Sequence, residues 1–329
     1  MTEKKRILSG MRPTGLLHLG NLHGALANWV KMQETYDCFF FIADWHALTS
    51  DYEDPSAITK YTRDVLIDWL SVGLSPDKST LFVQSEIREH AELYLILSMI
   101  TPVPWLERNP TYKDQILQLS NKDLSTFGFL GYPVLQAADI IMYKAYGVPV
   151  GVDQVPHVEI TREIARRFNH FYGDVFPEPE SILTKTPKIL GIDRRKMSKS
   201  YNNAIFISDD PDEIETKVAK MLTDPQRARR SDPGNPDVCN VFEFHKLYSD
   251  EPVIENINKT CRTAEIGCVE CKQTMAQFLK KALEPIRNKR KYYMERPQLV
   301  DDIISDGCDK ARKVAQETMG EVKEAISIK

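Results

Sequence analysis

Short apolar runs alternate with amphipathic stretches from about residue 7 to residue 200, and this alternation constrains the fold more than any other feature of the chain. Four runs have the length and residue types of buried strands, namely residues 6–10, 38–47, 79–85 and 148–152. Between them, residues 21–36 and 56–74 carry apolar side chains at spacings of three and four, which predicts helices. Strands that alternate with helices are typical of a parallel sheet, so we predict an α/β, Rossmann-like domain.

After residue 200 the strand-like runs give way to longer helical patterns. These patterns cover residues 211–223, 238–249, 271–294 and 309–328. The length of 329 residues fits two domains on a scale of roughly 150 residues each. A polar stretch with proline and glycine, from Lys185 to Asn203, marks the boundary. We therefore predict a parallel-sheet domain over residues 1–200 and a helical domain over residues 201–329.

The composition excludes several classes of protein. With 42% apolar and 27% charged residues, the chain has the balance of an ordinary globular protein. It has no apolar run of membrane-spanning length and no signal-peptide pattern at its start, so we expect a cytoplasmic protein with no membrane partner. The net charge of −4 gives no overall positive field of the kind that favours nucleic acid.

A glycine-containing turn follows the first predicted strand and leads into a helix. The sequence GMRPTGLLHLGN, residues 10–21, places three glycines where backbone N–H groups can approach an anion closely. Further donors in the same segment are Arg12, Thr14, His18 and Asn21. Such a turn predicts a phosphate site, although similar turns also occur without any ligand.

A second polar segment, KMSKS, spans residues 196–200 and follows Asp193, Arg194 and Arg195. A basic loop by itself is usually solvated surface. Together, however, the HLGN turn and the KMSKS segment resemble the two signature motifs of class I aminoacyl-tRNA synthetases, in the same order and across an α/β domain.

This resemblance implies an enzyme that activates an amino acid with ATP and Mg²⁺. An amino-acid carboxylate is already ionised at pH 7, so its attack on the α-phosphate needs orientation and charge neutralisation rather than a general base. The resemblance implies catalytic roles for His18, Asn21, Lys196 and Lys199. It also implies an ATP site made of Arg12, Pro13, Thr14, Gly20, Asn21, Gly151, Val152, Asp153, Ile189, Lys196, Met197, Ser198, Lys199 and Ser200.

The segments GYPVLQAADIIMY, residues 131–143, and VPVGVDQ, residues 148–154, are similar to those of tryptophanyl-tRNA synthetases. Asp139 interrupts an apolar helical pattern, and from the residues alone it is either a buried acceptor or a carboxylate that faces solvent or pairs with a lysine. The resemblance implies that Asp139 accepts the indole N–H and that Tyr132 and Gln154 bind the ammonium group. The implied tryptophan site consists of Leu8, Gly10, Tyr132, Gln136, Asp139, Val148, Val150 and Gln154.

Two alternatives remain open from the sequence. A tyrosyl-tRNA synthetase shares the fold, both motifs and a similarly placed aspartate. A paralogue that binds nucleotide or RNA without catalysis would retain the fold, but both signature motifs are intact here. Arg12 and Gln136 depart from the glutamine and methionine that many bacterial tryptophanyl enzymes have at these places.

Four of the six cysteines fall within 33 residues, at Cys239, Cys261, Cys268 and Cys271. Four thiolates so close together predict a metal site, and the spacing alone leaves zinc and iron open. The chain resembles a branch of tryptophanyl-tRNA synthetases with a C-terminal [4Fe–4S] cluster, so this cluster is the expectation and Zn²⁺ the alternative. Cys38 and Cys308 are expected to be free thiols, the latter in a polar helix start.

Basic side chains gather in residues 217–230 and 272–291, on both sides of the cysteines. They include Arg227, Arg229, Arg230, Arg287, Lys289, Arg290 and Lys291, which are candidates for phosphate contacts, and Tyr292 and Tyr293 are candidates for base stacking. The resemblance implies that this region binds the anticodon arm of tRNA(Trp) and that the protein is a homodimer.

Overall fold

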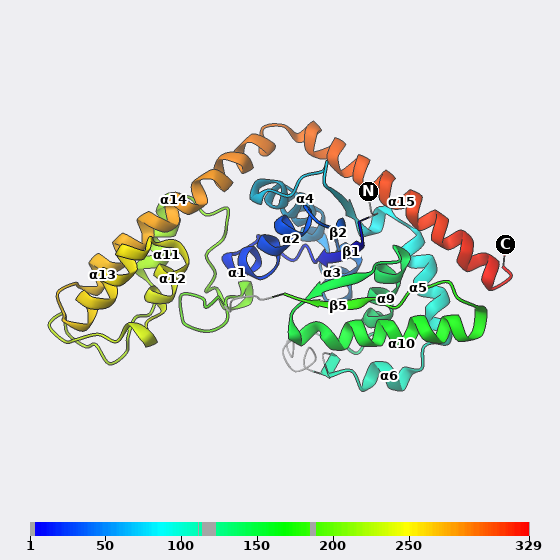
Figure 1. Ribbon diagram of the computed structural model, residues 1–329, viewed down its shortest axis with the longest axis horizontal. Helices are drawn as coiled ribbons and strands as arrows, with labels where there is room; N and C mark the ends of the chain where they lie inside the picture. Colours follow the sequence, from blue (N-terminus) through cyan, green and yellow to red (C-terminus); the bar gives the residue numbers. More distant parts are fainter. Residues whose placement is uncertain (1–3, 111, 114–122, 185–188, 329) are drawn as a thin grey trace.

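A parallel sheet of five strands forms the centre of the computed structural model, which describes residues 4–110, 112–113, 123–184 and 189–328 (Figure 1). The strand order is β3-β2-β1-β4-β5, and every neighbouring pair is parallel. The strands are β1 (Arg6–Met11), β2 (Asp37–Ile42), β3 (Ser79–Val83), β4 (Gly147–Val150) and β5 (Glu180–Leu183). The predicted Rossmann-like class is therefore confirmed.

Two strand predictions need correction. The strand predicted over residues 38–47 ends at Ile42, and helix α3 (Asp44–Asp51) follows, because the Asp44 carboxylate accepts the N–H groups of Trp45 and Ser85 near the start of that helix. Strand β5 was not predicted, since it lies at the edge of the sheet and its burial pattern is mixed rather than a continuous apolar run.

Helices cover both faces of the sheet, and a separate apolar core lies on each face. The helix predicted over residues 21–36 is three consecutive elements, α1 (Leu19–Asn21), the π-helical turn η1 (Leu22–Leu26) and α2 (Ala27–Met32). The remaining helices of this part are α4 (Ser56–Val72), α5 (Glu89–Ile100), α6 (Val103–Glu107), α8 (Phe127–Leu130), α9 (Tyr132–Met142) and α10 (Val155–Tyr172).

The strand order reverses between β1 and β4. The chain moves from β1 through β2 to β3 on one side of the sheet and from β4 to β5 on the other. In open parallel sheets this reversal leaves a crevice at the carboxyl ends of the two strands, which is where ligands bind. Two of the segments with predicted site residues lie at these strands: the HLGN turn follows β1, and residues 148–154 begin in β4 and continue beyond its end.

The remainder of the described chain is helical, as predicted. It contains α11 (Pro211–Ala219), α12 (Asn240–Tyr248), α13 (Glu251–Arg262), α14 (Cys268–Met294) and α15 (Pro297–Ala325). Figure 1 shows α11, α12 and α13 in a lobe at one end of the molecule, from which α14 extends along the top toward α4. Helix α13 falls between two predicted helices and was missed.

The last helix, α15, returns over the sheet and packs against the edge strand β3 and against α5. A Cβ atom at Gly307 would lie 1.8 Å from the Leu81 carbonyl oxygen, so only glycine allows this approach. Cys308 is buried on the same face, in the interior of α15, and not in the polar helix start that we expected. The helix thereby covers an edge that would otherwise expose unpaired backbone groups.

No helix in the described part of the chain combines the length and apolarity needed to cross a bilayer.

Candidate active site

A cavity of about 390 Å³ lies at the crevice between the carboxyl ends of β1 and β4. Its walls include all eight residues of the implied tryptophan site, which are Leu8, Gly10, Tyr132, Gln136, Asp139, Val148, Val150 and Gln154. Arg12 and Gly151 from the implied ATP site also line it. The structure therefore brings together segments that are more than 100 residues apart in the sequence.

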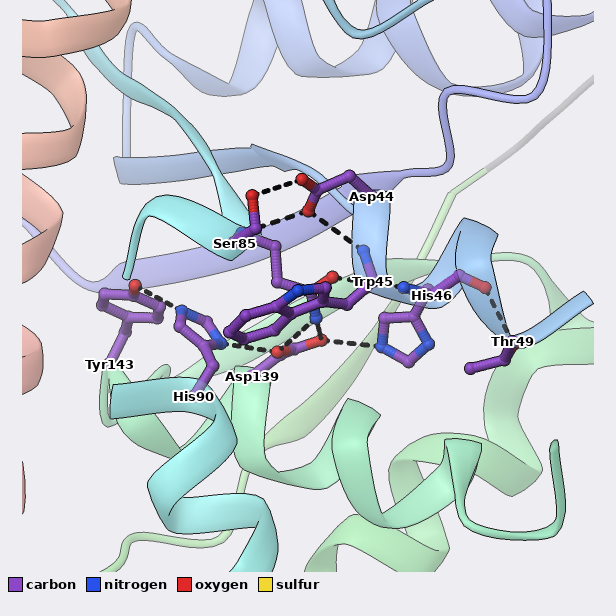
Figure 2. Close-up of polar contacts among 9 residues, drawn as sticks. Asp44, Trp45, His46, Thr49, Ser85, His90, Asp139 and Tyr143 are labelled. Carbon is purple, nitrogen blue, oxygen red and sulfur yellow. Dashed lines mark hydrogen bonds and ion pairs between the residues drawn. The ribbon is translucent and has the colours of Figure 1, made fainter. Parts of the chain in front are cut away.

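Asp139 is fully buried and accepts hydrogen bonds from three side chains (Figure 2). The Nε2 of Gln84 donates to both carboxylate oxygens at 2.8 and 2.9 Å. His90 donates from Nδ1 to Oδ1 at 2.5 Å, and His46 donates from Nε2 to Oδ2 at 2.8 Å. Asp139 is thus a buried acceptor at the cavity wall, and the interpretation as a solvent-facing or lysine-paired charge is wrong.

The protons in this network follow from the neighbouring pKa values. Burial raises the pKa of Tyr143 well above its usual range, so its hydroxyl keeps its proton and donates to Nε2 of His90 at 2.7 Å. The proton on His90 then lies at Nδ1, toward Asp139. Burial by itself raises the pKa of Asp139, but the hydrogen bond from His46 and the charge and hydrogen bond of His90 hold this pKa below its ordinary value.

Sequence reasoning missed several residues of the cavity. His46, in α3, is one of them, and its position just after a buried strand in ADWHA was the available signal. Asn28 and His157 also line the cavity. Among the described contacts, the buried Tyr132 hydroxyl, His157 Nδ1 and Asn28 Nδ2 have no hydrogen-bond partner, although all three residues line the cavity.

His18 begins helix α1 and is held in a reciprocal cap. Its Nδ1 accepts the Asn21 N–H at 3.3 Å, and the Asn21 Oδ1 accepts the His18 N–H at 3.0 Å. Burial, together with the charge of Lys199, lowers the pKa of His18 to about 4. The neutral imidazole therefore carries its proton on Nε2, where it is a donor. A Cβ at Gly20 would lie 2.9 Å from this ring, which explains the glycine.

The KMSKS segment lies against the HLGN turn. Lys199 donates from Nζ to the Gly15 carbonyl at 2.9 Å, and burial and the charge of Arg12 lower the pKa of Lys199 to about 8. Gly15 has φ +131°, a conformation that favours glycine. An antiparallel bridge between His18 and Phe206 joins the HLGN turn to the chain that follows the KMSKS segment.

Asn203 is a further residue that sequence reasoning missed. It is buried, its Oδ1 accepts the Ser198 N–H at 2.8 Å, and its Nδ2 donates to Asp193 at 2.7 Å and to the Lys196 carbonyl at 3.2 Å. These bonds fix the backbone on both sides of the signature segment, while the Lys196 side chain is exposed.

The other implied ATP residues lie outside the cavity walls, on the segments around it. Ile189 and Met197 are buried and joined by a backbone hydrogen bond of 3.1 Å, whereas Thr14 and Val152 are exposed. The side chain of Ser200 lies outside the described residues. The remaining members of this group are Pro13, Gly20, Asn21, Asp153, Lys196, Ser198 and Lys199.

The four clustered cysteines approach one another in the C-terminal lobe. Burial, followed by the neighbouring thiols of Cys239, Cys261 and Cys268, raises the pKa of Cys271 to about 12. None of the four forms a disulfide. In the described part of the chain, no three His, Cys, Asp or Glu side chains are close enough to hold a single metal ion.

Several arginines proposed for tRNA phosphates have protein partners instead. Arg227 lies 3.8 Å from the Sγ atoms of Cys261 and Cys268 and donates to the Ile266 carbonyl, and Arg230 donates to the carbonyls of Ala264 and Glu265. Arg290 is buried and forms ion pairs with Asp64 and Asp68 at 2.9 Å each. The interpretation of Arg290 as a phosphate contact is therefore wrong, because a guanidinium beside two aspartates in α4 is already neutralised.

The fold and the two motifs together define a class of protein. A parallel sheet that carries an HLGN turn after its first strand, with a KMSKS segment folded against that turn, is the arrangement of a class I aminoacyl-tRNA synthetase.

Comparison with known proteins agrees with this class. The family profile for tRNA synthetases of class I (W and Y) matches residues 1–284. The tryptophan–tRNA ligase of Thermotoga maritima is 54% identical, with 98% of this chain and 99% of the relative covered, and that of Aquifex aeolicus is 46% identical, with 98% and 100% covered. The tryptophanyl-tRNA synthetase of Campylobacter jejuni, solved with ADP and tryptophan, superposes with a TM-score of 0.91 at 35% identity, with 98% and 100% covered. The chain belongs to the class I tRNA synthetase family of tryptophan and tyrosine enzymes.

Proposed function

We propose that this chain is a tryptophan–tRNA ligase that forms tryptophanyl-adenylate from L-tryptophan and ATP and then transfers the tryptophanyl group to tRNA(Trp). The observation that carries the proposal is the cavity, whose walls hold all eight residues of the implied tryptophan site beside the two phosphate-binding motifs. The relatives at 46% and 54% identity, both tryptophan–tRNA ligases, support the same substrate.

In the first reaction the tryptophan carboxylate attacks the α-phosphate of ATP and pyrophosphate leaves. No group on the protein needs to remove a proton, so the residues orient the substrates and neutralise charge. His18, neutral with its proton on Nε2, donates to a phosphate oxygen, and Asn21 holds the imidazole in this tautomer through the cap. Lys196 and Lys199 stabilise the leaving pyrophosphate, to which Mg²⁺ supplies further positive charge.

The other implied ATP residues serve binding rather than chemistry. Gly151, Val152 and Asp153 follow β4, where they meet the ribose. Arg12, Pro13, Thr14 and Gly20 belong to the turn after β1, and Ile189, Met197, Ser198 and Ser200 belong to the strand-like segment and loop that close over the adenine and phosphates. Arg12 lines the cavity and adds a positive charge beside Lys199.

The proposed site binds the polar ammonium end of tryptophan and its apolar ring with different residues. The unpartnered Tyr132 hydroxyl and the Gln154 amide bind the ammonium group, and Leu8, Gly10, Val148 and Val150 surround the ring. Asp139 accepts the indole N–H at the inner wall. Phenylalanine offers no donor at this position, so we expect it to be discriminated against. Gln136 adds a polar contact in the same wall.

The main alternative is activation of tyrosine. A similarity to the tyrosyl-tRNA synthetase of Archaeoglobus fulgidus at 20% identity concerns the fold only. A phenol O–H and an indole N–H are both donors, so the contacts of Asp139 fit either ring. The tryptophan–tRNA ligases at 46% and 54% identity support tryptophan. A non-catalytic paralogue is disfavoured because both lysines of KMSKS and the HLGN cap are intact.

The four cysteines are proposed to hold a [4Fe–4S] cluster, with Zn²⁺ as the alternative. The four thiols are near enough to influence one another's pKa, and four cysteine thiolates are the usual ligands of such a cluster. Cys268 and Cys271 occupy the first turn of α14, where backbone N–H groups stabilise thiolates.

The C-terminal helical part is proposed to bind the anticodon arm, with the domain division at about residue 200. Lys289 and Lys291 are exposed on α14, Tyr292 is also exposed, and Arg229 lies beside the cysteine lobe. A homodimer is proposed as well. Leu95, Met99 and Val103 present exposed apolar side chains on α5 and α6, which a second copy of the chain would cover.

Charging of purified tRNA tests this function. The protein should attach labelled tryptophan to tRNA(Trp) and leave tRNA(Tyr) uncharged with either amino acid. Charging of tRNA(Tyr) with tyrosine at a comparable rate would replace the proposal with the tyrosyl alternative.

A further inference from the structure

Helix α12 belongs to the C-terminal lobe (Figure 1), yet it contacts residues that flank both phosphate-binding motifs. At its last residue, the Tyr248 hydroxyl lies 2.7 Å from Nε2 of His23, and the two rings meet edge to face with centroids 5.5 Å apart. His23 belongs to the π-helical turn η1, directly after the HLGN residues. Burial raises the pKa of Tyr248 and lowers that of His23, so the phenol donates and a neutral imidazole accepts.

At its first residue, α12 holds the base of the KMSKS segment. Asn240 is buried and donates from Nδ2 to the Gly191 carbonyl at 2.7 Å. Gly191 in turn donates its N–H to the Arg195 carbonyl at 2.7 Å, immediately before Lys196. A Cβ at Gly191 would lie 2.3 Å from Asn203, the residue that binds the backbone at Lys196 and Ser198. The Asn240 contact therefore acts on the most tightly packed point of the loop.

The two contacts lie at opposite ends of one short, well-packed helix. Eight residue steps separate Asn240 from Tyr248, or roughly 12 Å along the helix axis. Between them, Val241 and Phe244 are buried in the same apolar core as Leu19 and Leu26, which flank His23 in sequence. A rigid element of fixed length thus joins the HLGN turn to the KMSKS segment.

The four-cysteine site lies against the same helix. Cys239 is the residue at the N-terminal cap of α12, and Nε2 of His245 lies 3.5 Å from the Cys271 sulfur. Helix α12 is therefore held in place by the part of the C-terminal lobe that contains the four cysteines.

We propose that α12 sets the spacing of the two phosphate-binding motifs and that Tyr248 and Asn240 are positioning residues for adenylate formation, acting through His23 and Gly191. The expected change in kcat rests on the proposed function, whereas the expected change in the positions of the two motifs does not. Adenylate formation needs His18 and Lys199 on the same phosphates, and small displacements of catalytic groups lower rates steeply. None of the eight residues of the implied tryptophan site makes either contact, so tryptophan affinity should change much less than kcat.

Kinetics of the variants Tyr248→Phe and Asn240→Ala test the proposal. In tryptophan-dependent exchange of pyrophosphate into ATP, each variant should lower kcat by about tenfold, the effect of one lost hydrogen bond at a buried site. The KM for tryptophan should stay within twofold, a range set by about 0.4 kcal/mol. Tyr146→Phe is the matched control, because it removes an equally short phenol bond, 2.7 Å to Glu180, at a site remote from both motifs.

Hydrogen exchange of the ligand-free protein gives a second readout that needs no activity. Tyr248→Phe should speed amide exchange in residues 19–26, and Asn240→Ala should speed it in residues 190–203, each without affecting the other segment. If both variants keep the parental kcat, or if exchange is unchanged at both motifs, the proposal is wrong. If kcat falls only in step with the unfolding midpoint and with tryptophan affinity, the contacts are merely structural and the proposal is also wrong. If the parent protein activates a different amino acid, only the proposed function is refuted. The variants can then be compared with the parent protein on that amino acid, so the positioning role is still tested.

Discussion

Asp139 is a fully buried carboxylate, and three donating side chains make this possible. Gln84, His90 and His46 donate to its two oxygens, and the Tyr143 hydroxyl lies against the other ring nitrogen of His90. His46 donates to the Asp139 carboxylate and also lines the cavity. Substrate binding and the internal hydrogen-bond network therefore share the carboxylate oxygen atoms of Asp139. Recognition of the ligand is thereby linked to the stability of the fold.

The variant Asp139→Asn should lower the free energy of unfolding by about 3 kcal/mol, because its amide nitrogen would face side chains that donate. Since the folded pKa of Asp139 lies below its usual value of 3.8, its contribution is present above the unfolded pKa and is lost as the pH falls through the folded pKa. Urea unfolding at neutral and acid pH measures both effects. The exposed Asp306→Asn is the control and should change stability by less than about 0.5 kcal/mol. Equal stability of parent and Asp139→Asn would contradict this account of the network.

Lys199 should impose an alkaline limit on the first reaction. Its pKa of about 8 in the free protein means that its charge is present below that pH and is lost as the pH rises through it. The value of kcat/KM for ATP in pyrophosphate exchange should therefore decline near pH 8, and Lys199→Arg should move this decline to higher pH while lowering the rate. Persistence of the same inflection in Lys199→Arg would assign it to another group.

At the scale of elements, the ion pairs of Arg290 join α14 to α4. Burial raises the pKa of Asp68 to about 7 even though the charge of Arg290 acts to lower it. Two carboxylates and one guanidinium in this place are stable only as a set, since a buried charge that loses its partner is costly. The contact fixes the long helix that connects the cysteine lobe with the sheet.

Arg290→Met should destabilise the protein by about 3 to 5 kcal/mol, because it leaves the two aspartates without a partner. Lys289→Met, at the exposed neighbouring position, is the matched control and should change stability by less than about 0.5 kcal/mol. Chemical unfolding followed by circular dichroism measures both. A loss for Arg290→Met no larger than that of its neighbour would show that the pairs contribute little.

The strands β1, β2, β3 and β4 could be predicted because their apolar runs are buried on both faces. Edge strand β5 could not, since partial exposure removes the alternating signal on which such predictions depend. Helix α13 does carry a helical pattern, with Val253, Ile254 and Ile257 on its core-facing side, and was overlooked. The residues of the tryptophan cavity were found through a resemblance to a family. The donors around Asp139 were not, because Gln84 and His90 carry no local pattern and meet the carboxylate only through the folding of β3 and α5 onto α9.

The partners of Arg290 and Arg227 could not be predicted from the sequence either. In the sequence both stand in basic clusters, which are typical of phosphate contacts. In the structure, Arg290 forms ion pairs with aspartates on α4, and Arg227 contacts the loops that carry the cysteines. Partners that are more than 200 residues apart, as for Arg290 and Asp68, leave no trace in local composition.

At the scale of the whole molecule, the sheet places one cavity beside two motifs, and the C-terminal lobe adds a group of four thiols. Anaerobically purified protein should contain about four iron atoms and four sulfides per chain, as a [4Fe–4S] cluster requires. Replacement of Cys271 by serine should remove most of the iron and lower the unfolding midpoint. Stoichiometric zinc without iron would favour the alternative, and protein without either metal would contradict a metal site.

The central claim is that the cavity at the end of β1 and β4 activates tryptophan. It is tested most directly by amino-acid-dependent exchange of pyrophosphate into ATP, measured for each of the twenty amino acids without tRNA. The account predicts exchange with tryptophan and rates for tyrosine and phenylalanine that are lower by at least about a thousandfold in kcat/KM. Exchange with tyrosine equal to or faster than that with tryptophan, or no exchange with any amino acid, would contradict it.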